Sequence, residues 1–340
     1  DLRSKTTERV SVSSAEVEGD AASSAGGLAI SPGGRFVTFT SLATNLASGN
    51  DDSICAPDPC PDTYIRDRTA GTTRMLVPFD GVSPAVDMRL SAGARYFAFD
   101  GEQPSGIAWC RRSPRKCVEA DVLPPSVKVD RADADAYLGG MSLGGRFILF
   151  RKIGGRDPGS VSAGGVFLRD VATRTTHIVT VNPLDRASAL SPQGRFILFT
   201  SRSKKLVKHD TNKRSDVFIR DRRTGATRRI SVSSNEHESN GSSLGIAISS
   251  HGRYCLFSST ATNLVAGDTN GERDLFLRDR TLGTTVRIDV SSSGSQSNGP
   301  VRFSALSADG RWAAFGSPAT NLVATDTNSA RDVFSHGPLH

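Results

Sequence analysis

The stretch Ile246–Val290 decides the fold. It reads I-A-I-S-S-H-G-R-Y-C-L-F-S-S-T-A-T-N-L-V-A-G-D-T-N-G-E-R-D-L-F-L-R-D-R-T-L-G-T-T-V-R-I-D-V. Four short apolar or β-branched runs alternate here with turns and one polar loop, which is typical of a four-stranded antiparallel meander. Such a sheet has two faces and two open edges, so it is not stable alone. We therefore expect neighbouring copies of it.

The turn that leads into the second strand recurs six times. The copies begin 49 to 60 residues apart and are Ser31–Phe36, Ser91–Tyr96, Ser142–Phe147, Ser191–Phe196, Ser249–Tyr254 and Ser307–Trp312. A period near 50 with four strands per repeat is typical of a β-propeller. We predict an all-β fold, a six-bladed β-propeller of four-stranded antiparallel blades. The blades cover about residues 25–77, 82–129, 133–181, 185–233, 243–291 and 301–336 of one domain over 1–340.

The two ends of the chain complement each other. Thr6–Ser13 matches the fourth-strand copies Ala226–Ser233 and Thr284–Ser291, although it precedes the first blade. The last blade stops after its third strand, Asp332–Phe334. We expect the N-terminal strand to pair with the last blade, because an unpaired strand edge is a liability that closure removes.

The charge and hydropathy of the chain disfavour a nucleic-acid partner and a transmembrane helix. The chain carries 42 basic and 35 acidic residues, a formal charge of +7. The basic residues are spread through the repeats, which favours solvated strand faces over a weakly basic surface that attracts anionic glycans, envelope polymers or nucleic acid. RNA-binding motifs with interleaved aromatics are absent, so nucleic acid is disfavoured as a partner. No apolar run approaches the ~20 residues of a transmembrane helix, and no signal peptide is present, although a mature chain would have lost it.

Four of the five cysteines form two close pairs. Cys55 and Cys60 bracket a Pro-rich loop, and Cys110 and Cys117 bracket a predicted hairpin. Both pairs suit local disulfides in an oxidising compartment. Their spacings, in separate blades, argue against a four-Cys metal site. Cys255 lies in mid-strand, where we expect a small buried apolar residue.

Two motifs carry a resemblance to a known repeat. S-P-G-G-R-F-V-T-F at Ser31–Phe39 and D-V-F-I-R-D at Asp216–Asp221 resemble the TolB-like, WD40-like (PD40) propeller repeat. The resemblance covers nearly the whole chain. It implies a six-bladed propeller in a secreted, periplasmic or cell-envelope protein. TolB carries an α/β domain before its propeller and works with the Tol–Pal system; that domain has no counterpart here, which argues against a Tol role.

A repeated Arg and a repeated Asp predict a cross-strand ion pair. The Arg opens the second strand and the Asp ends the third, so the two side chains lie at the same end of each blade. We interpret the pairs as structural. They are Arg35–Asp67, Arg146–Asp170, Arg195–Asp221 and Arg253–Asp279.

The loop between the second and third strands is the candidate metal site. Oxygen ligands at its positions 1, 3 and 7 are typical of calcium loops, although Ca²⁺ takes six to eight oxygens in all. The alternative is an Asx turn, in which Asp and Asn side chains bind loop amides. We expect the Asn of the upstream Ala-Thr-Asn-Leu copies (Asn45, Asn263, Asn321) to brace this loop. The candidate ligands are Asp210, Asn212, Asp216, Asp268, Asn270, Asp274, Asp326, Asn328 and Asp332.

Catalytic patterns are weak. Gly140–Gly144 fits Gly-x-Ser-x-Gly, but Ser142 occupies the ordinary hairpin turn of the repeat instead of a strand-to-helix elbow. The six histidines are scattered over different repeat positions, without a readable triad or metal spacing. We assign no catalytic residue from the sequence.

Three functions are compatible with these patterns. The first is a non-catalytic binding or scaffold propeller, with a protein or glycan partner at the face made by the Asp-Thr-Asn loops and the Ser-rich blade connections. The second is a carbohydrate-active enzyme, a polysaccharide lyase or hydrolase, that uses the propeller mouth. The third is a structural subunit of an extracellular assembly. We choose the first.

Overall fold

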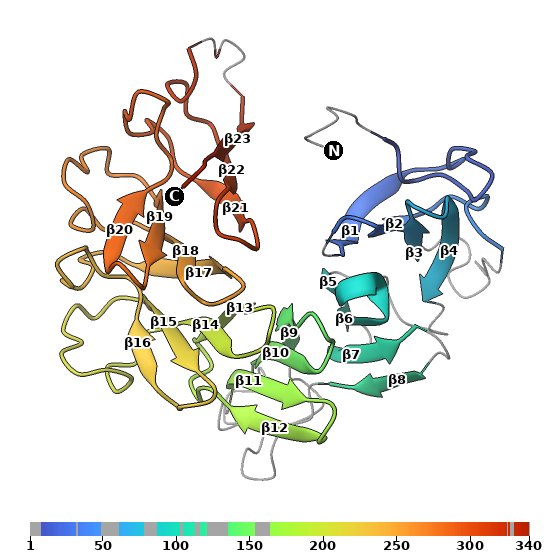
Figure 1. The fold of residues 1–340 in the computed structure, drawn as a ribbon, viewed down its shortest axis with the longest axis horizontal. Coiled ribbons are helices and arrows are strands. Elements are labelled where there is room, and N and C mark those ends of the chain that lie inside the picture. Colours follow the sequence, from blue (N-terminus) through green and yellow to red (C-terminus); the bar gives the residue numbers. More distant parts are fainter. Residues whose placement is uncertain are drawn as a thin grey trace, which may run out of the picture. The chain divides into compact units, whose positions relative to one another are not determined.

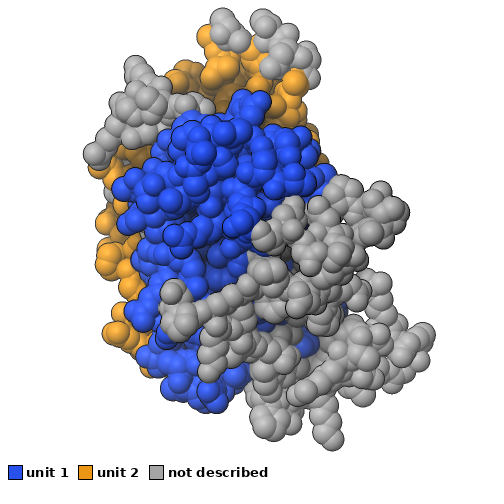
Figure 2. Space-filling model, turned by 90° about the vertical axis from the view of Figure 1, so that its right-hand side faces the viewer, with its two compact units in different colours: residues 1–160, 169–176 blue, residues 161–168, 177–340 orange. Residues whose placement is uncertain are grey.

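The computed structural model describes most of the 340 residues. The described residues are 8–31, 33–48, 61–77, 87–102, 105–112, 116–120, 135–153, 164–324, 326 and 330–339. They divide into two compact units, residues 1–160 with 169–176 and residues 161–168 with 177–340, which Figure 2 colours separately.

The first two sheets belong to the N-terminal unit. One contains β1 (Ser23–Ile30), β2 (Phe36–Ser41), β3 (Asp62–Asp67) and β4 (Thr72–Val77). The next contains β5 (Asp87–Leu90), β6 (Tyr96–Glu102), β7 (Ser105–Arg111) and β8 (Lys116–Glu119), with the short 3-10 turn η2 (Ala92–Ala94) before β6. The third sheet contains β9 (Ala136–Met141), β10 (Phe147–Lys152), β11 (Gly165–Asp170) and β12 (Thr175–Ile178).

Three further sheets lie in the C-terminal unit. Blade 4 contains β13 (Arg186–Leu190), β14 (Phe196–Ser201), β15 (Asp216–Asp221) and β16 (Thr227–Arg229). Blade 5 contains β17 (Ser243–Ile248), β18 (Tyr254–Ser259), β19 (Asp274–Asp279) and β20 (Thr284–Arg287). Blade 6 contains β21 (Arg302–Leu306), β22 (Ala313–Ser317) and β23 (Asp332–His336).

The predicted fold class is confirmed. Within the described residues the protein is all-β, and six antiparallel sheets with strands in sequence order fall one into each predicted blade of a six-bladed β-propeller (Figure 1). The last sheet has three strands in the described part of the chain. That the N-terminal strand completes this last sheet stays a prediction. The single domain over residues 1–340 also stays a prediction. No helix in the described ranges is long and apolar enough to cross a membrane.

The second and third strands form the core of each blade. In blade 5 every residue of β18 and β19 is buried, because these central strands are covered on both faces. One aromatic from each of the two strands stacks on the other, with ring centroids 5.6 Å apart for Phe257 and Phe276 and 5.7 Å apart for Phe199 and Phe218. Cys255 is free and fully buried in this core, as predicted, and burial raises the pKa of its thiol to about 12.

The serine that begins the turn before the second strand stabilises that turn through its hydroxyl. In blade 5 the hydroxyl of Ser249 accepts a hydrogen bond from the Tyr254 amide at 3.0 Å, and Gly252 takes a left-handed φ of 71°. Ser142 accepts the same bond from Phe147 at 3.0 Å. The hydroxyl in the Gly-x-Ser-x-Gly pattern therefore has the turn role that the sequence indicates.

The four predicted Arg–Asp pairs are present. Each Arg donates from Nε and Nη2 to its carboxylate, for example from Arg35 to Asp67 at 2.9 and 2.7 Å. Those hydrogen bonds lower the pKa of Asp67 to about 2. In the other three pairs the Arg Nη2 lies 2.6–2.7 Å from the Asp Oδ2. These pairs are Arg146–Asp170, Arg195–Asp221 and Arg253–Asp279.

Three connecting segments share one conformation. Residues 11–20, 231–240 and 289–298 each contain an isolated antiparallel bridge, Val12–Glu18, Val232–Glu238 and Val290–Gln296. The Asn of each Ala-Thr-Asn-Leu motif accepts a connector amide through Oδ1 and donates to a connector carbonyl through Nδ2, at 2.8–3.1 Å. These Asn are the loop-amide partners that the sequence predicts, but they hold the connector and not the Asp-Thr-Asn loop.

Candidate functional site

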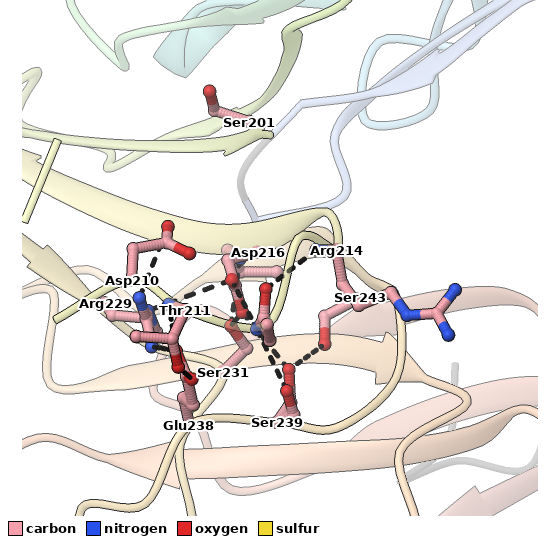
Figure 3. A network of polar contacts seen from close by, with 12 residues as sticks. Ser201, Asp210, Thr211, Arg214, Asp216, Arg229, Ser231, Glu238, Ser239 and Ser243 are labelled. Carbon is pink, nitrogen blue, oxygen red and sulfur yellow. Dashed lines mark hydrogen bonds and ion pairs between the residues drawn. The ribbon is translucent and has the colours of Figure 1, made fainter. Parts of the chain in front are cut away.

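The candidate site in blade 4 combines three segments. They are the loop between β14 and β15, strand β16, and connector 231–240, and Figure 3 shows how their polar side chains converge. The predicted Asp-Thr-Asn loop supplies Asp210, Asn212 and Asp216. All segments belong to the C-terminal unit.

Asp216 is the buried centre of the network. Its Oδ1 accepts hydrogen bonds from the hydroxyls of Ser231 at 2.6 Å and Ser239 at 3.1 Å, and its Oδ2 accepts one from Asn212 Nδ2 at 2.8 Å. The side chain is 0% exposed. Three donors thus compensate the carboxylate for the lost solvent.

Arg229 supplies the positive charge of the site. Its side chain is 8% exposed and lies 3.3 Å from Asp210 Oδ2, 3.9 Å from Asp216 Oδ2 and 2.6 Å from Glu238 Oε2. Burial raises the pKa of Asp210 above its ordinary value, although Arg229 opposes this. Burial also acts to raise the pKa of Glu238, but hydrogen bonds from Thr211 and Arg229 outweigh it and hold that pKa below the ordinary value.

Blade 5 repeats the network with two substitutions. Arg287 lies 3.2 Å from Asp268 and 3.4 Å from Asp274, and Asn270 Nδ2 donates to Asp274 Oδ1 at 2.9 Å. Asp289 stands in place of Ser231, and Gln296, whose Oε1 accepts a hydrogen bond from Arg287 Nη1, stands in place of Glu238. Burial, and then the charge of Asp274, raise the pKa of Asp289 to about 9.

The groups around Asp216 act mainly as hydrogen-bond donors. The groups that face Asp216 are hydroxyls, an amide NH₂ and a guanidinium, whereas Ca²⁺ takes six to eight oxygen ligands. Among the residues with described positions, no group of three or more His, Cys, Asp or Glu is arranged to hold a metal ion. Asn212 Oδ1 accepts from the Arg214 amide at 2.7 Å, and Asn270 Oδ1 from the Glu272 amide at 3.0 Å. The arrangement favours the Asx-turn alternative, and calcium binding stays a prediction.

A pocket of about 820 Å³ opens beside the blade 4 network. Five Lys or Arg, two His and two Glu line it, drawn from the β14–β15 loop, β16, connector 231–240 and the end of β19. Its lining includes Arg229 and Glu238, so the buried network forms part of the pocket wall. The Asp-Thr-Asn loop and the Ser-rich connection, which the sequence assigns to one ligand face, therefore meet at one pocket.

The remaining predicted site residues are only partly described. In the third Asp-Thr-Asn loop, Asp326 and Asp332 are described, whereas Asn328 lies outside the described residues. Cys55 and Cys60 also lie outside them. Cys110 and Cys117 stand directly opposite each other in the register of β7 and β8, a position compatible with a disulfide. Both disulfides stay predictions.

Two features of the site were not predicted from the sequence. The first is a local cluster of lysines. Of the eight Lys in the chain, four lie within residues 204–213, so the basic residues are less evenly spread than their overall count indicates. The second is an Arg one residue before the Asp that ends the third strand: Arg278 is 6% exposed, pairs with Glu236 and donates to the Ser233 carbonyl at 3.0 Å. The repeated Arg-Asp dipeptide is the signal that identifies this Arg.

Comparisons with known proteins support the fold alone. No protein-family model matches the chain, and no curated protein matches it. The structure is similar to oligogalacturonate lyase in complex with manganese, with a TM-score of 0.54 and 10% identity over 83% of this chain and 67% of the other. It is also similar to the β-propeller domain of the Trilobed protease from Pyrococcus furiosus, with a TM-score of 0.53 and 11% identity over 87% of this chain and 77% of the other.

A third similar structure is TolB from Acinetobacter baumannii. The TM-score is 0.43 and the identity 15%, over 80% of this chain. The chain spans 55% of the length of that protein. At these identities the lyase and the protease domain show a shared propeller fold.

Proposed function

We propose that this protein is a non-catalytic binding module of a secreted, periplasmic or envelope-associated kind, with a glycan or protein partner. The ligand face is the one made by the Asp-Thr-Asn loops and the Ser-rich connectors. The observation that carries the proposal is the pocket of about 820 Å³ at the junction of these two segments in blade 4. Pockets of this size accommodate a small ligand or a few residues of a polymer.

The rigidity of the pocket wall supports a binding role. The Asp-Thr-Asn loop is tied to strand β16 and to the connector by Arg229, and its own Asx turn fixes the backbone. A preformed wall lowers the conformational entropy that is lost when a ligand binds. Within the network Ser231 donates to Asp216, and Arg229 forms ion pairs with Asp210 and Glu238, whereas Arg229 Nε and Nη2 have no hydrogen-bond acceptor among the described residues.

A binding screen on the whole chain tests this function. We expect saturable binding to at least one member of a glycan array or to one envelope protein in a pull-down, with no release of shorter fragments from the bound polymer. Parallel measurements with EDTA test the calcium prediction, and mass mapping of the non-reduced chain tests the Cys55–Cys60 and Cys110–Cys117 pairs. Measurable depolymerisation of a polysaccharide, at a rate that depends on the pocket, would reject a non-catalytic role.

A further inference from the structure

We propose, as a refinement that rests on the binding function above, that the blade 4 pocket binds an anionic polysaccharide through Lys208, His209, Arg228 and His237. All four line the pocket and are exposed. The side chains of these four residues make no hydrogen bond or ion pair with another described residue, although the His237 amide donates to Ser233 Oγ at 3.2 Å. Their charges and donors face the space in the pocket and are free to meet a ligand.

The other cations of the pocket are already neutralised. Arg229 pairs with Asp210 and Glu238, and Arg278 pairs with Glu236. Both Arg side chains are buried, and their ion pairs hold the loop and the connector in place. The positive charge that remains for a ligand therefore comes from the exposed side chains and from Arg280.

Arg280 adds a partly desolvated cation to the same pocket. It lies over the Phe196 ring, 5.0 Å from its centroid, and burial lowers the pKa of its guanidinium, with a further contribution from nearby Arg228. The like charges of Arg228 and Arg280 repel each other. An anion between them relieves that repulsion, and its attraction to the pair is strengthened by the partial exclusion of water.

Blade 5 provides an internal comparison. It repeats the Asp, Asn and Arg of the network, but at the four exposed positions it has Ala266, Gly267, Val286 and Ser295. The four side chains of the pocket are therefore not needed to build a blade of this type. At its surface blade 4 differs from blade 5 by these four side chains and also by Glu236 and Glu238, where blade 5 has Gly294 and Gln296.

Backbone strain at His209 also supports a binding role for its side chain. His209 has a φ of 59°, and its counterpart Gly267 has a φ of 70°. Left-handed backbone suits Gly and costs about 1 kcal/mol for a residue with a side chain. Blade 4 thus keeps a side chain at a position where the same loop in blade 5 has Gly, and strained residues of this kind cluster at binding sites.

The extent of the basic surface favours a polymer over a single small anion. Lys204, Lys205 and Lys213 are exposed and lie on the same β14–β15 loop as Lys208. Repeated negative charges along a chain could meet these residues in turn. A polysaccharide is favoured over nucleic acid because no Phe, Tyr or Trp lines the pocket among the described residues, which leaves only His209 and His237 for the base stacking that largely holds single-stranded nucleic acid.

The test replaces the four residues by those of blade 5. The variant Lys208→Ala, His209→Gly, Arg228→Val, His237→Ser keeps the framework, and its fold is checked by circular dichroism and thermal unfolding. The control variant Arg223→Ala, Arg302→Ala removes the same formal charge from exposed positions of the same unit outside the pocket lining. Calorimetric titration of the whole chain uses alginate, dextran sulfate, uncharged dextran and single-stranded DNA.

We expect the wild-type chain to bind alginate or dextran sulfate and not dextran, with binding that weakens as salt rises. The blade 5 replacement should weaken this binding by about tenfold or more, and the control variant by less than about twofold. A preference between the two polymers identifies the anionic group as carboxylate or sulfate. Equal binding by wild type and replacement, or tighter binding of DNA than of either polysaccharide, overturns the proposal. Binding only to a neutral glycan or a protein overturns it but leaves the binding function standing, whereas binding to nothing in either screen rejects both.

Discussion

Asp289 in blade 5 is predicted to make the stability of this protein fall as pH rises through neutrality. Its side chain is 0% exposed and its Oδ1 accepts a hydrogen bond from the Leu275 amide at 2.9 Å. Its Oδ2, like Oδ2 of Asp274, receives no hydrogen bond from a described donor. Asp274 pairs with Arg287, and burial, followed by the charge of Asp274, raises the pKa of Asp289 to about 9, so that Asp289 holds a proton at neutral pH.

The sign and size of the effect follow from proton linkage. Between an ordinary Asp pKa of 3.8 and the folded value of about 9, the folded chain holds this proton and the unfolded chain does not. The free energy of unfolding therefore falls by about 1.4 kcal/mol for each pH unit in that window. The stabilisation is complete below pH 3.8 and is lost as pH rises towards 9. From pH 5 to pH 8 the loss amounts to about 4 kcal/mol.

The variant Asp289→Asn isolates this proton. Its amide keeps an oxygen for the Leu275 amide and offers an N–H to Asp274, but it does not titrate. Urea unfolding at pH 5, 6, 7 and 8 should give a pH slope that is flatter than the wild-type slope by about 1.4 kcal/mol per unit. Asp309→Asn is the control, because hydrogen bonds from the Ser307 hydroxyl and the Arg311 amide lower the pKa of Asp309 and keep it ionised throughout this range. Parallel slopes for wild type and Asp289→Asn would refute the proton held by Asp289.

Two further predictions concern the repeat itself. Gly252→Ala should lower the melting temperature by several degrees more than Gly225→Ala. Both glycines have a left-handed φ, 71° and 73°, so the backbone strain is the same. Only at Gly252 would the new Cβ meet a ring carbon of Phe196, at 2.3 Å. In the exposed Arg35–Asp67 pair, NMR titration should give a pKa of about 2 for Asp67, and Arg35→Gln should move it towards 3.8. Stability from this pair is present above about pH 4 and is lost as pH falls towards 2, and an unchanged Asp67 titration in the variant would contradict the account.

The sequence predicted the parts of the fold that depend on neighbouring residues. The turn Ser-x-x-Gly-Arg is short, and the serine hydroxyl binds an amide five residues on, so its recurrence marks each hairpin directly. The Arg–Asp pair could also be predicted, because antiparallel pairing brings the start of one strand to the end of the next.

The connectors could not be predicted in the same way. Asn263 Nδ2 donates to the carbonyl of Glu238, 25 residues away, across a junction whose geometry is set by blade packing and not by any local pattern.

The candidate site was predicted in its residues but not in its chemistry. Asp210, Asn212 and Asp216 do lie together, as their spacing indicates. The sequence could not show that Arg229 enters the same space, because it lies in a later strand, and only the β15–β16 pairing brings the two together. In the same way, the sequence shows Asp289 only as one polar residue in a β-branched run. Its proximity to Asp274 becomes visible only in the three-dimensional structure.

Repetition within the chain separates framework from function. Positions that blades 4 and 5 share, such as Arg229 and Arg287, hold loops to strands through buried contacts, and selection for folding is sufficient to explain them. Positions at which the blades differ are of two kinds. Ser231 against Asp289 is a buried difference that changes how stability responds to pH, whereas Lys208 against Ala266 is an exposed difference that leaves the framework intact. An exposed cation without a partner contributes little to folding, so the exposed differences of blade 4 are where a ligand is expected to act.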